Sequence, residues 1–331
     1  MGGSRQPLMT ASRRSTLALL GALACTSHIP KSFAQATQKL QLLRVAIISR
    51  TVFYAPLWAA QAQHLFRDQG LSVVISVYDN AERITQDLRD GQIDIAISTP
   101  ESIMVDAYNH GPLRMVAGNA EKLPHQIIAR PHIQSDKDLK GARFGVLSLK
   151  EGTAYLVKRY AQSVGLQPTE YSVVSVGGAP TRWKRLQESS IDVGFQPFPL
   201  SYVAEEAGYT NLGAVSTLVP DWLFTSINVH QQWAQQNGDA LRQFLMVMLS
   251  AQNQLSVQQQ ALTPMLAHEL QTTGAFASRA IEQALRLQMF APQLRVHEPA
   301  VKAVFEGLID TGQIAQQTAL RLETFFDASY L

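Results

Sequence analysis

The chain has 331 residues, of which 16% are charged, and its formal net charge is +2 at pH 7. It contains no block of like charges, which argues against a nucleic-acid-binding protein and against a polybasic membrane patch. Behind the N-terminal segment about 295 residues remain, enough for two domains.

The first residues predict a secretory signal peptide. A pair of arginines, Arg13 and Arg14, is followed by a short apolar core over Leu17–Ala24. Residues Ser32–Ala34 then form a small-residue cleavage site. The apolar core is too short for a membrane span, which takes about 20 residues. We therefore expect residues 1–34 to be removed and the mature chain to act in the periplasm, reached by the twin-arginine or by the general export route.

Cys25 is the one cysteine of the sequence and lies inside this predicted signal. Cleavage after Ala34 leaves no cysteine, which excludes disulfides and thiolate metal sites from the mature chain. Alternatively, Cys25 becomes a lipid-anchored N-terminus. Ala22 fits that alternative poorly, because such sites prefer a branched apolar residue there, so we favour the chain without an anchor.

From Arg44 onward, short apolar strands alternate with helical segments, the pattern of an α/β protein with mainly parallel sheets. The strands of the first block are predicted at Arg44–Ile48, Leu71–Val77, Ile93–Ile97 and Leu113–Ala117. A single helix is predicted from Pro56 to the stop at Gly70, with Trp58, Ala62, Leu65 and Phe66 on one face. A second follows the cap Asp79 or Asn80 and ends at Gly91, and a third runs from Thr99-Pro100 to Gly111.

A second α/β block follows a hydrophilic break at Asn119–His125. Its strands are predicted at Gln126–Ala129, Arg143–Leu147, Tyr171–Val176, Ile191–Phe195 and Leu212–Val215, with helices beginning near Gly152, Ala179 and Pro199. Leu223–Val229 is a further strand. From Gln231 the chain is nearly all helical, with an apolar face made of Leu241, Phe244, Leu245, Met248 and Leu255. Later helices are predicted at Ala280–Met289, Pro299–Ile309 and Thr318–Phe326.

The order of these parts predicts two lobes joined by a hinge. The C-terminal helices have no sheet of their own, so we expect them to pack on the first lobe. The chain then crosses to the second lobe near Asn119–His125 and returns near Ser226–Val229. The first lobe comprises residues 35–122 plus 228–331, and the second 123–227. Two crossings make a hinge and a cleft, where ligands bind at strand ends and helix N-termini.

Several short stretches, in a fixed order between Arg44 and Val229, carry a family resemblance. They are Tyr54–Ala60 with Phe66–Leu71, Gly91–Ala96, Asp138–Val146, Gly165-Leu166, Ile191–Gly194 and Glu206–Tyr209. The chain resembles periplasmic substrate-binding proteins of ABC importers, in the cluster that takes up nitrate, sulfonates, taurine and pyrimidine precursors of thiamine. The resemblance implies a type II periplasmic binding protein fold. The C-terminal segment resembles the family only in being predicted as helical.

Four loops are expected to meet at the cleft, and a fifth position follows from the resemblance. Thr51 and neighbouring N–H groups could hold an oxyanion, although Phe53 and Tyr54 could equally plug the domain interface. A threonine in the position of Thr99 more often caps its own helix than binds a ligand. If Glu101 points into the cleft, the ligand is expected to carry an amine or a ring N–H. The predicted ligand-binding residues are Arg50, Thr51, Phe53, Tyr54, Ser98, Thr99, Gly152, Thr153, Tyr155, Gly178, Arg182 and Gln196.

The function that the resemblance implies is capture of a small organic anion and its delivery to an ABC permease. The anion is expected to be a sulfonate or carboxylate, with or without an aromatic ring, gripped between Thr51 or Tyr54 and Thr153 or Arg182. We expect no catalytic residue, metal, cofactor or nucleic acid, and a monomer. An enzyme of the same fold acting on a pyrimidine or aromatic acid remains an alternative, as does a ligand-presenting sensor. The scattered histidines His64, His110 and His125 are expected at the surface or at helix ends.

Overall fold

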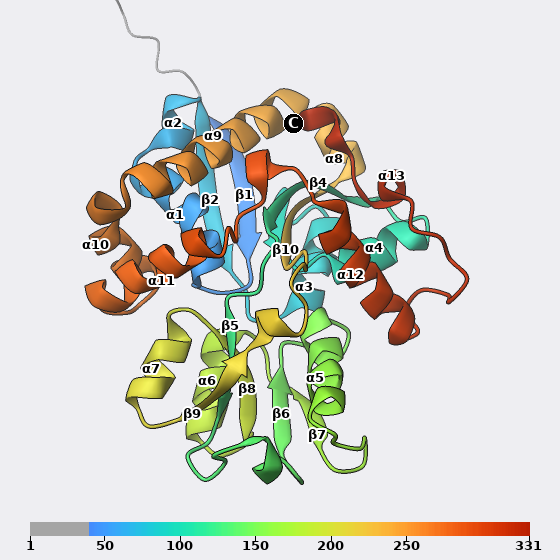
Figure 1. The fold of residues 1–331 in the computed structure, drawn as a ribbon. Helices are drawn as coiled ribbons and strands as arrows, with labels where there is room; N and C mark the ends of the chain where they lie inside the picture. Colours follow the sequence, from blue (N-terminus) through green and yellow to red (C-terminus); the bar gives the residue numbers. More distant parts are fainter. Residues whose placement is uncertain (1–39) are drawn as a thin grey trace, which may run out of the picture. The chain divides into compact units, whose positions relative to one another are not determined.

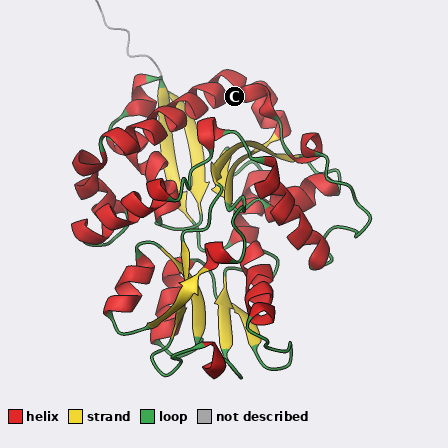
Figure 2. Cartoon of the chain, in the orientation of Figure 1, coloured by secondary structure: helices red, strands yellow, loops and turns green. Residues whose placement is uncertain are grey.

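The computed structural model describes residues 40–331 as two lobes, each built around one five-stranded sheet (Figures 1 and 2). The predicted signal peptide, its cleavage site and Cys25 lie outside the described residues. The sheet of the first lobe contains β1 (Gln41–Ile47), β2 (Leu71–Val77), β3 (Ile95–Ser98), β4 (Leu113–Ala120) and β10 (Thr225–His230). The sheet of the second lobe contains β5 (His125–Ala129), β6 (Arg143–Val146), β7 (Ser172–Ser175), β8 (Val193–Pro197) and β9 (Thr210–Ala214).

Both sheets have the same strand pattern, in the orders β2-β1-β3-β10-β4 and β7-β6-β8-β5-β9. In the first, β1 runs parallel to β2 and β3, whereas β10 lies antiparallel between β3 and β4. In the second, β6 runs parallel to β7 and β8, whereas β5 lies antiparallel between β8 and β9. One strand in each sheet therefore opposes the others, which fits the expected two-lobed fold with mainly parallel sheets.

An equivalent ion pair joins two neighbouring parallel strands in each sheet. In the middle of β1, Arg44 donates from its backbone N–H and its guanidinium to Asp94, at 2.7 to 3.0 Å. At the start of β6, Arg143 donates to Asp192 from the same groups, at 2.8 to 3.0 Å. Asp94 directly precedes β3 and Asp192 directly precedes β8, so each ion pair ties that strand to its parallel neighbour. Burial opposes ionisation of Asp192, but Arg143 more than offsets this and lowers the pKa of its carboxyl group.

The helices between the strands cover the sheets as Figure 1 shows. Those of the first lobe are α1 (Ala55–Ala62), α2 (Leu65–Asp68), α3 (Ala81–Arg89) and α4 (Glu101–Tyr108). Those of the second lobe are α5 (Gly152–Ser163), α6 (Ala179–Gln187) and α7 (Leu200–Glu206). The C-terminal helices are α8 (Gln231–Gln236), α9 (Gly238–Val257), α10 (Gln259–Glu269), α11 (Gly274–Arg286), α12 (Glu298–Asp310) and α13 (Leu322–Phe325).

The C-terminal helices pack on the first lobe, as expected. The five apolar residues predicted to share a face of α9 are all buried, and α9 lies against α1 and α2. Phe244 of α9 stacks on Phe66 of α2, with ring centroids 5.2 Å apart. Helices α12 and α13 lie against α4, and α12 also contacts α5 of the second lobe. Apolar area removed from water is the main stabilising contribution of such contacts.

Two predicted helices differ in the structure. The single helix expected from Pro56 to Gly70 is broken, because His64 adopts a left-handed φ of 58° between α1 and α2. The break turns the chain, so Ala62 is exposed instead of lying on the buried face with Phe66. The helix expected over Thr318–Phe326 is only the short α13.

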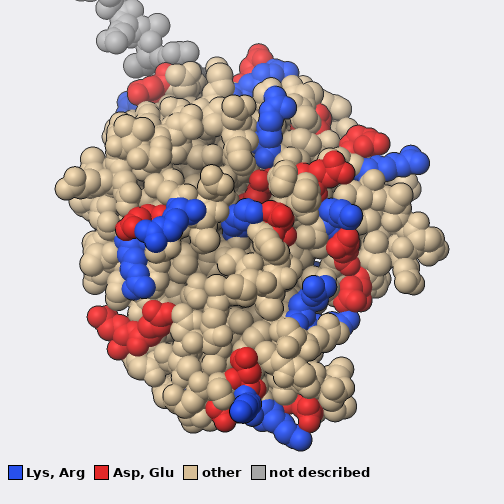
Figure 3. Space-filling view, viewed as in Figure 1, with Lys and Arg blue, Asp and Glu red and all other residues tan. Residues whose placement is uncertain are grey.

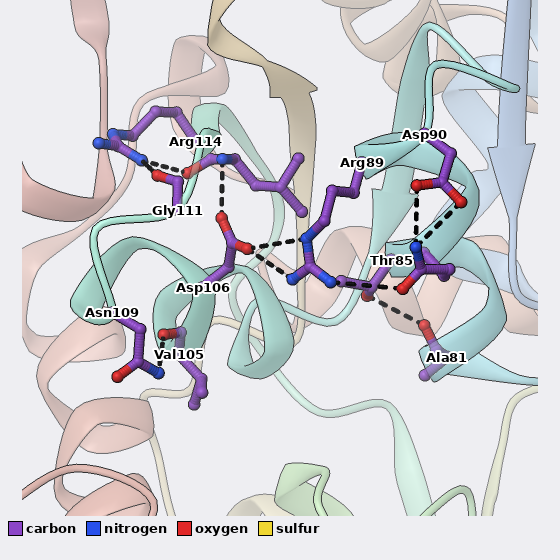
Figure 4. A network of polar contacts seen from close by, with 11 residues as sticks. Ala81, Thr85, Arg89, Asp90, Val105, Asp106, Asn109, Gly111 and Arg114 are labelled. Carbon is purple, nitrogen blue, oxygen red and sulfur yellow. Dashed lines mark hydrogen bonds and ion pairs between the residues drawn. The ribbon is translucent and has the colours of Figure 1, made fainter.

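A buried carboxylate holds three elements of the first lobe together (Figure 4). Asp106 of α4 accepts two hydrogen bonds from the guanidinium of Arg89, at the end of α3. Its second oxygen accepts the backbone N–H of Leu113, the first residue of β4, at 2.8 Å. Glycine at position 111 makes room for the carboxylate, because a Cβ there would lie only 2.3 Å from an Asp106 oxygen.

Within residues 40–331, no helix combines the length and apolar character needed to cross a membrane. The same part of the chain contains no group of three or more His, Asp or Glu side chains placed to hold a metal ion.

Candidate functional site

A cavity lies where the two lobes meet, at the carboxyl ends of their central strands. It offers about 30 Å³ to the centres of water molecules, room for one or two waters. The lining residues come from both lobes and from the segments that join them, and they include no Asp or Glu. They are Ile48, Ser49, Phe53, Tyr54, Thr99, His125, Leu147, Thr153, Gly178, Ala179, Arg182, Phe224 and Thr225.

The loop after β1 forms the aromatic wall on the first lobe. A short 3-10 helix at Val52–Tyr54 turns Phe53 and Tyr54 into the protein, and both are buried. The Tyr54 hydroxyl accepts the backbone N–H of Ile48 at 3.2 Å, which ties the loop back to the strand. Burial raises the pKa of Tyr54 well above its ordinary value, so this hydroxyl stays protonated.

Thr99 contributes a hydroxyl from the loop between β3 and α4. The sequence left two roles open for Thr99, capping of α4 and ligand binding. The structure does not show the first, because the cap position is Pro100 and no side chain caps the helix. Its Oγ1 is enclosed and has no hydrogen-bond partner in the structure. The hydroxyl is therefore free to bind something in the cavity.

Arg182 of α6 supplies the positive charge of the cavity, and 3% of the residue is exposed. Its guanidinium donates to the Phe195 carbonyl at 3.0 and 2.5 Å and to the Gly177 carbonyl at 3.3 Å. No carboxylate of the described residues forms an ion pair with it. Burial lowers the pKa of Arg182 to about 10, which still leaves it charged at neutral pH.

Two glycines make room for the stem of Arg182 over the second sheet. A Cβ on Gly194 of β8 would lie 3.1 Å from Cγ of Arg182, and one on Gly145 of β6 would lie 3.4 Å from it. The side chain therefore crosses the ends of β6 and β8 in close contact with the backbone. The sequence showed Arg182 as one arginine of a polar helix start, and gave no sign of these glycines beneath it.

His125 is a cavity residue that the sequence analysis missed. We expected it at the surface or at a helix end, but 2% of it is exposed, at the start of β5. Its ring lies 4.8 Å from Phe224, edge to face, and 6.3 Å from Phe53, nearly parallel. Burial first, and the charge of Arg182 second, lower the pKa of His125 well below its ordinary value. The ring is therefore neutral, and its Nδ1 has no hydrogen-bond partner.

Two further predicted residues, Thr153 and Gly178, line the cavity at the first turns of α5 and α6. The Thr153 hydroxyl accepts the backbone N–H of Leu147 at 3.3 Å and so joins α5 to the end of β6. Gly178 is the N-cap of α6, and a Cβ there would lie 3.4 Å from the carbonyl oxygen of Ile48 in the other lobe. Six of the predicted residues thus line the cavity: Phe53, Tyr54, Thr99, Thr153, Gly178 and Arg182.

The other predicted residues lie around the cavity without lining it. Arg50 pairs with Glu269 and lies over the Trp58 ring at 4.9 Å, in an outer groove that shares Ile48, Ser49 and Gly178 with the cavity. The Thr51 hydroxyl bonds that of Ser49 at 3.1 Å, and Ser98 accepts from Asn228 at 3.1 Å.

Gln196 is fully enclosed and fixes the start of α6. With the amide oriented to suit its neighbours, the oxygen accepts the backbone N–H of Trp183 at 3.1 Å and the nitrogen donates to the Ala179 carbonyl at 3.3 Å. The residue thus holds in place the helix that carries Arg182.

A second contact between the lobes joins two buried glutamates. Glu101, the first residue of α4, accepts the Gly152 N–H of the second lobe at 2.9 Å. Glu151, just before α5, accepts the Ser102 hydroxyl of the first lobe at 2.7 Å. Burial first, and then the charge of the nearby Glu151, raise the pKa of Glu101 well above its ordinary value. Oε2 of each glutamate is buried and has no hydrogen-bond partner among the described residues.

The remaining predicted residues belong to this glutamate contact. Gly152 and Tyr155 line a small cavity beside it with Trp222, whose ring stacks on Tyr155 at 5.7 Å. Glu101 therefore bonds the opposite lobe instead of reaching the cavity of Arg182.

On the face shown in Figure 3, charged side chains of both signs are interspersed among other residues.

Comparison with known proteins identifies the family. The NMT1/THI5-like family model matches residues 52–260, more than half of the sequence. The chain therefore belongs to the NMT1/THI5-like family. A search of curated proteins found no significant match.

Solved structures share the two-lobed fold at low sequence identity. A ligand-binding component of an ABC-type import system from Staphylococcus aureus, with zinc bound, is 12% identical at a TM-score of 0.74, covering 88% of this chain and 97% of that one. The periplasmic nitrate-binding protein NrtA from Synechocystis PCC 6803 is 12% identical at 0.72, covering 88% and 87%. The alkanesulfonate-binding protein SsuA from Xanthomonas axonopodis pv. citri, bound to MOPS, is 15% identical at 0.67, covering 83% and 94%. The fold is that of periplasmic binding proteins.

Proposed function

We propose that this protein is the extracytoplasmic binding component of an ABC importer and captures a small organic anion, a sulfonate or a carboxylate, between its lobes. The observation that carries this proposal is Arg182, a buried guanidinium in the cavity that pairs with no carboxylate of residues 40–331. A buried cation without a counter-charge is unfavourable, because burial removes its hydration. An anionic ligand would supply the missing charge.

The chemistry of Arg182 suits a sulfonate or carboxylate. Its planar guanidinium can donate two parallel hydrogen bonds to such a group. Three of its contacts go to backbone carbonyls, which orient the fork without neutralising it. The cavity is lined from both lobes and has room for only one or two waters in this structure, so a larger anion would hold the lobes further apart than they lie here. A ligand that contacts both lobes favours such a closed state by its differential affinity for it.

The partner and the compartment follow from the family and from the sequence. The solved relatives include binding components of import systems, which supports a permease as the partner. The predicted signal peptide supports a periplasmic location. Fractionation of cells that express the full chain should find the mature protein, starting near Gln35, in the periplasm as a monomer.

The test is calorimetric titration of the mature chain with nitrate, methanesulfonate, benzenesulfonate, acetate and benzoate. We expect at least one sulfonate or carboxylate to bind. The double variant Arg182→Ala, Thr153→Ala should lose at least about tenfold in affinity, because a paired charge in a dry site contributes roughly 2–5 kcal/mol. Arg185→Ala is the matched control, since Arg185 lies exposed on the same helix.

Unchanged affinity in the double variant would exclude the proposed grip. Loss of solute uptake in a deletion strain, restored by the wild-type chain, would support import. A sensor role would leave uptake intact and abolish a ligand-dependent response.

A further inference from the structure

Two polar atoms in the cavity wall have no partner, and they come from opposite lobes. Oγ1 of Thr99 belongs to the first lobe and Nδ1 of His125 to the second. Both residues line the cavity together with Arg182. Buried polar groups are nearly always hydrogen-bonded, so two unpartnered ones in a ligand cavity indicate what the ligand must provide.

The chemistry of the two groups is complementary. His125 is kept neutral, so one ring nitrogen carries a proton and the other a lone pair. Arg182 beside it can only donate. A threonine hydroxyl both donates and accepts. A hydroxyl on the ligand could accept from Thr99 and donate to the imidazole, which would satisfy both groups at once.

A charged amine would not fit the same place. Among the described residues, no Asp or Glu lines the cavity. The buried carboxylates Glu101 and Glu151 line a separate small cavity, where one oxygen of each accepts a hydrogen bond across the lobes. An ammonium group would thus be buried near the Arg182 charge without a counter-charge, which is strongly unfavourable.

We propose that the ligand is a small anion bearing an uncharged hydrogen-bonding substituent, such as a hydroxyl, and that Thr99 and His125 recognise this substituent while Arg182 binds the anionic group. This inference rests on the proposed function and specifies the solute class of the same site. Discrimination arises from the unpaired wall groups, which stay buried and unsatisfied when the substituent is absent.

The test uses two matched series that differ in one substituent. The sulfonates are ethanesulfonate, 2-hydroxyethanesulfonate and 2-aminoethanesulfonate, and the carboxylates are propionate, 3-hydroxypropionate and 3-aminopropionate. In at least one series the hydroxy compound should bind roughly tenfold or more tightly than the unsubstituted one. The amino compound should bind most weakly.

The variants His125→Phe and Thr99→Val separate recognition from folding. Phenylalanine keeps the aromatic packing against Phe53 and Phe224, and valine keeps the shape of threonine. Each should bring the ratio of affinities between the hydroxy and the unsubstituted compound close to one, whatever its effect on the affinity for the unsubstituted anion. His125→Gln, which keeps a hydrogen-bonding group, should retain part of the preference.

Four outcomes would overturn the inference. If anions bind but the hydroxy and unsubstituted compounds have equal affinity, the inference fails and the proposed function stands. The same holds if the preference survives in both variants, or if the amino compound binds most tightly. If no member of either series binds at millimolar concentration, both the inference and the proposed capture of small anions fail.

Discussion

Arg182 depends on two residues that have no side chain. Its aliphatic stem passes over Gly145 and Gly194, and its guanidinium then meets the backbone carbonyls of Phe195, in the middle of β8, and of Gly177, just before α6. Glycine at these positions therefore serves the ligand site as well as the sheet. The position of the arginine is thus set by its contact with β6 and β8 and by its place on α6.

We predict that Gly194→Ala weakens anion binding. The added Cβ would lie 3.1 and 3.2 Å from Cγ and Cδ of Arg182, so the stem must shift by a few tenths of an ångström and carry the guanidinium with it. Titration of the anion found for the wild type should show a several-fold loss, since small displacements of positioning groups have large effects.

Gly274→Ala is the matched control for this variant, because nothing lies within 4 Å of its Cβ position. It should bind as the wild type does. Equal affinity in Gly194→Ala and Gly274→Ala would show that Arg182 tolerates the shift.

His125 shows why single residues of the site escaped the sequence analysis. Phe53, Tyr54 and Arg182 could be named because they follow strands or begin helices, where ligands bind in such folds. His125 follows a hydrophilic stretch that looks exposed, yet it is enclosed by Phe53 and Phe224, residues far from it in sequence. Burial that depends on such long-range packing leaves no local pattern.

At the scale of elements, Asp106 joins α3, α4 and β4 through one carboxylate (Figure 4). We predict that Asp106→Asn lowers the free energy of unfolding by about 1–3 kcal/mol, because a buried charged hydrogen bond to Arg89 is lost and a donor is left facing donors. Chemical denaturation followed by circular dichroism measures the change.

The comparison variant is Asp90→Asn, at the exposed end of α3. Its carboxylate contacts only the Gln86 side chain, so the change should stay within about 0.5 kcal/mol. Equal changes in the free energy of unfolding for the two substitutions would mean that the contacts of Asp106 with α3 and β4 do not stabilise the lobe.

Whole elements were easier to predict than their ends. The apolar period of α9 and the alternation of β2 come from burial of one face, which repeats along the sequence. The break at His64 depends on one residue in a left-handed conformation, which no period reveals. The insertion of β10 between β3 and β4 likewise depends on pairing between residues more than a hundred positions apart.

At the scale of the molecule, the Glu101–Glu151 contact couples closure of the lobes to the uptake of a proton. Two buried carboxylates so close to each other cannot both be ionised. In an open cleft Glu101 would be hydrated and would regain its ordinary pKa of 4.5, so it would be ionised near neutral pH. Closure therefore takes up a proton at pH values between 4.5, the ordinary pKa of Glu101, and its raised value in the closed state.

We predict that the closed state is favoured as the pH falls through the raised pKa of Glu101, by up to about tenfold per pH unit. The gain is fully present below pH 4.5 and is lost above the raised pKa. His125 acts in the opposite direction below pH 6.5, because burial lowers its pKa and closure must release its proton. Lys150 and Tyr155 are the other titratable residues that line the cavity beside the glutamates.

Small-angle scattering of the His125→Phe variant across this pH range isolates the glutamates. The radius of gyration should decrease as the solution is acidified, and Glu151→Gln in the same background should remove most of the dependence. A pH response that is identical with and without Glu151 would contradict the coupling.

The path of the chain between the sheets also determines the order in which the lobes can form. The strands of the second sheet are continuous in sequence, from His125 to Ala214, so they can pair as soon as they have been made. The first sheet has to wait, because β10 occupies the place between β3 and β4 and is its last strand to be synthesised. Strands β1, β2 and β3 pair directly with one another, but β4 can join them only when Thr225 and the rest of β10 pair beside it. Folding of the N-terminal lobe is thus completed from its C-terminal side, after the inserted lobe.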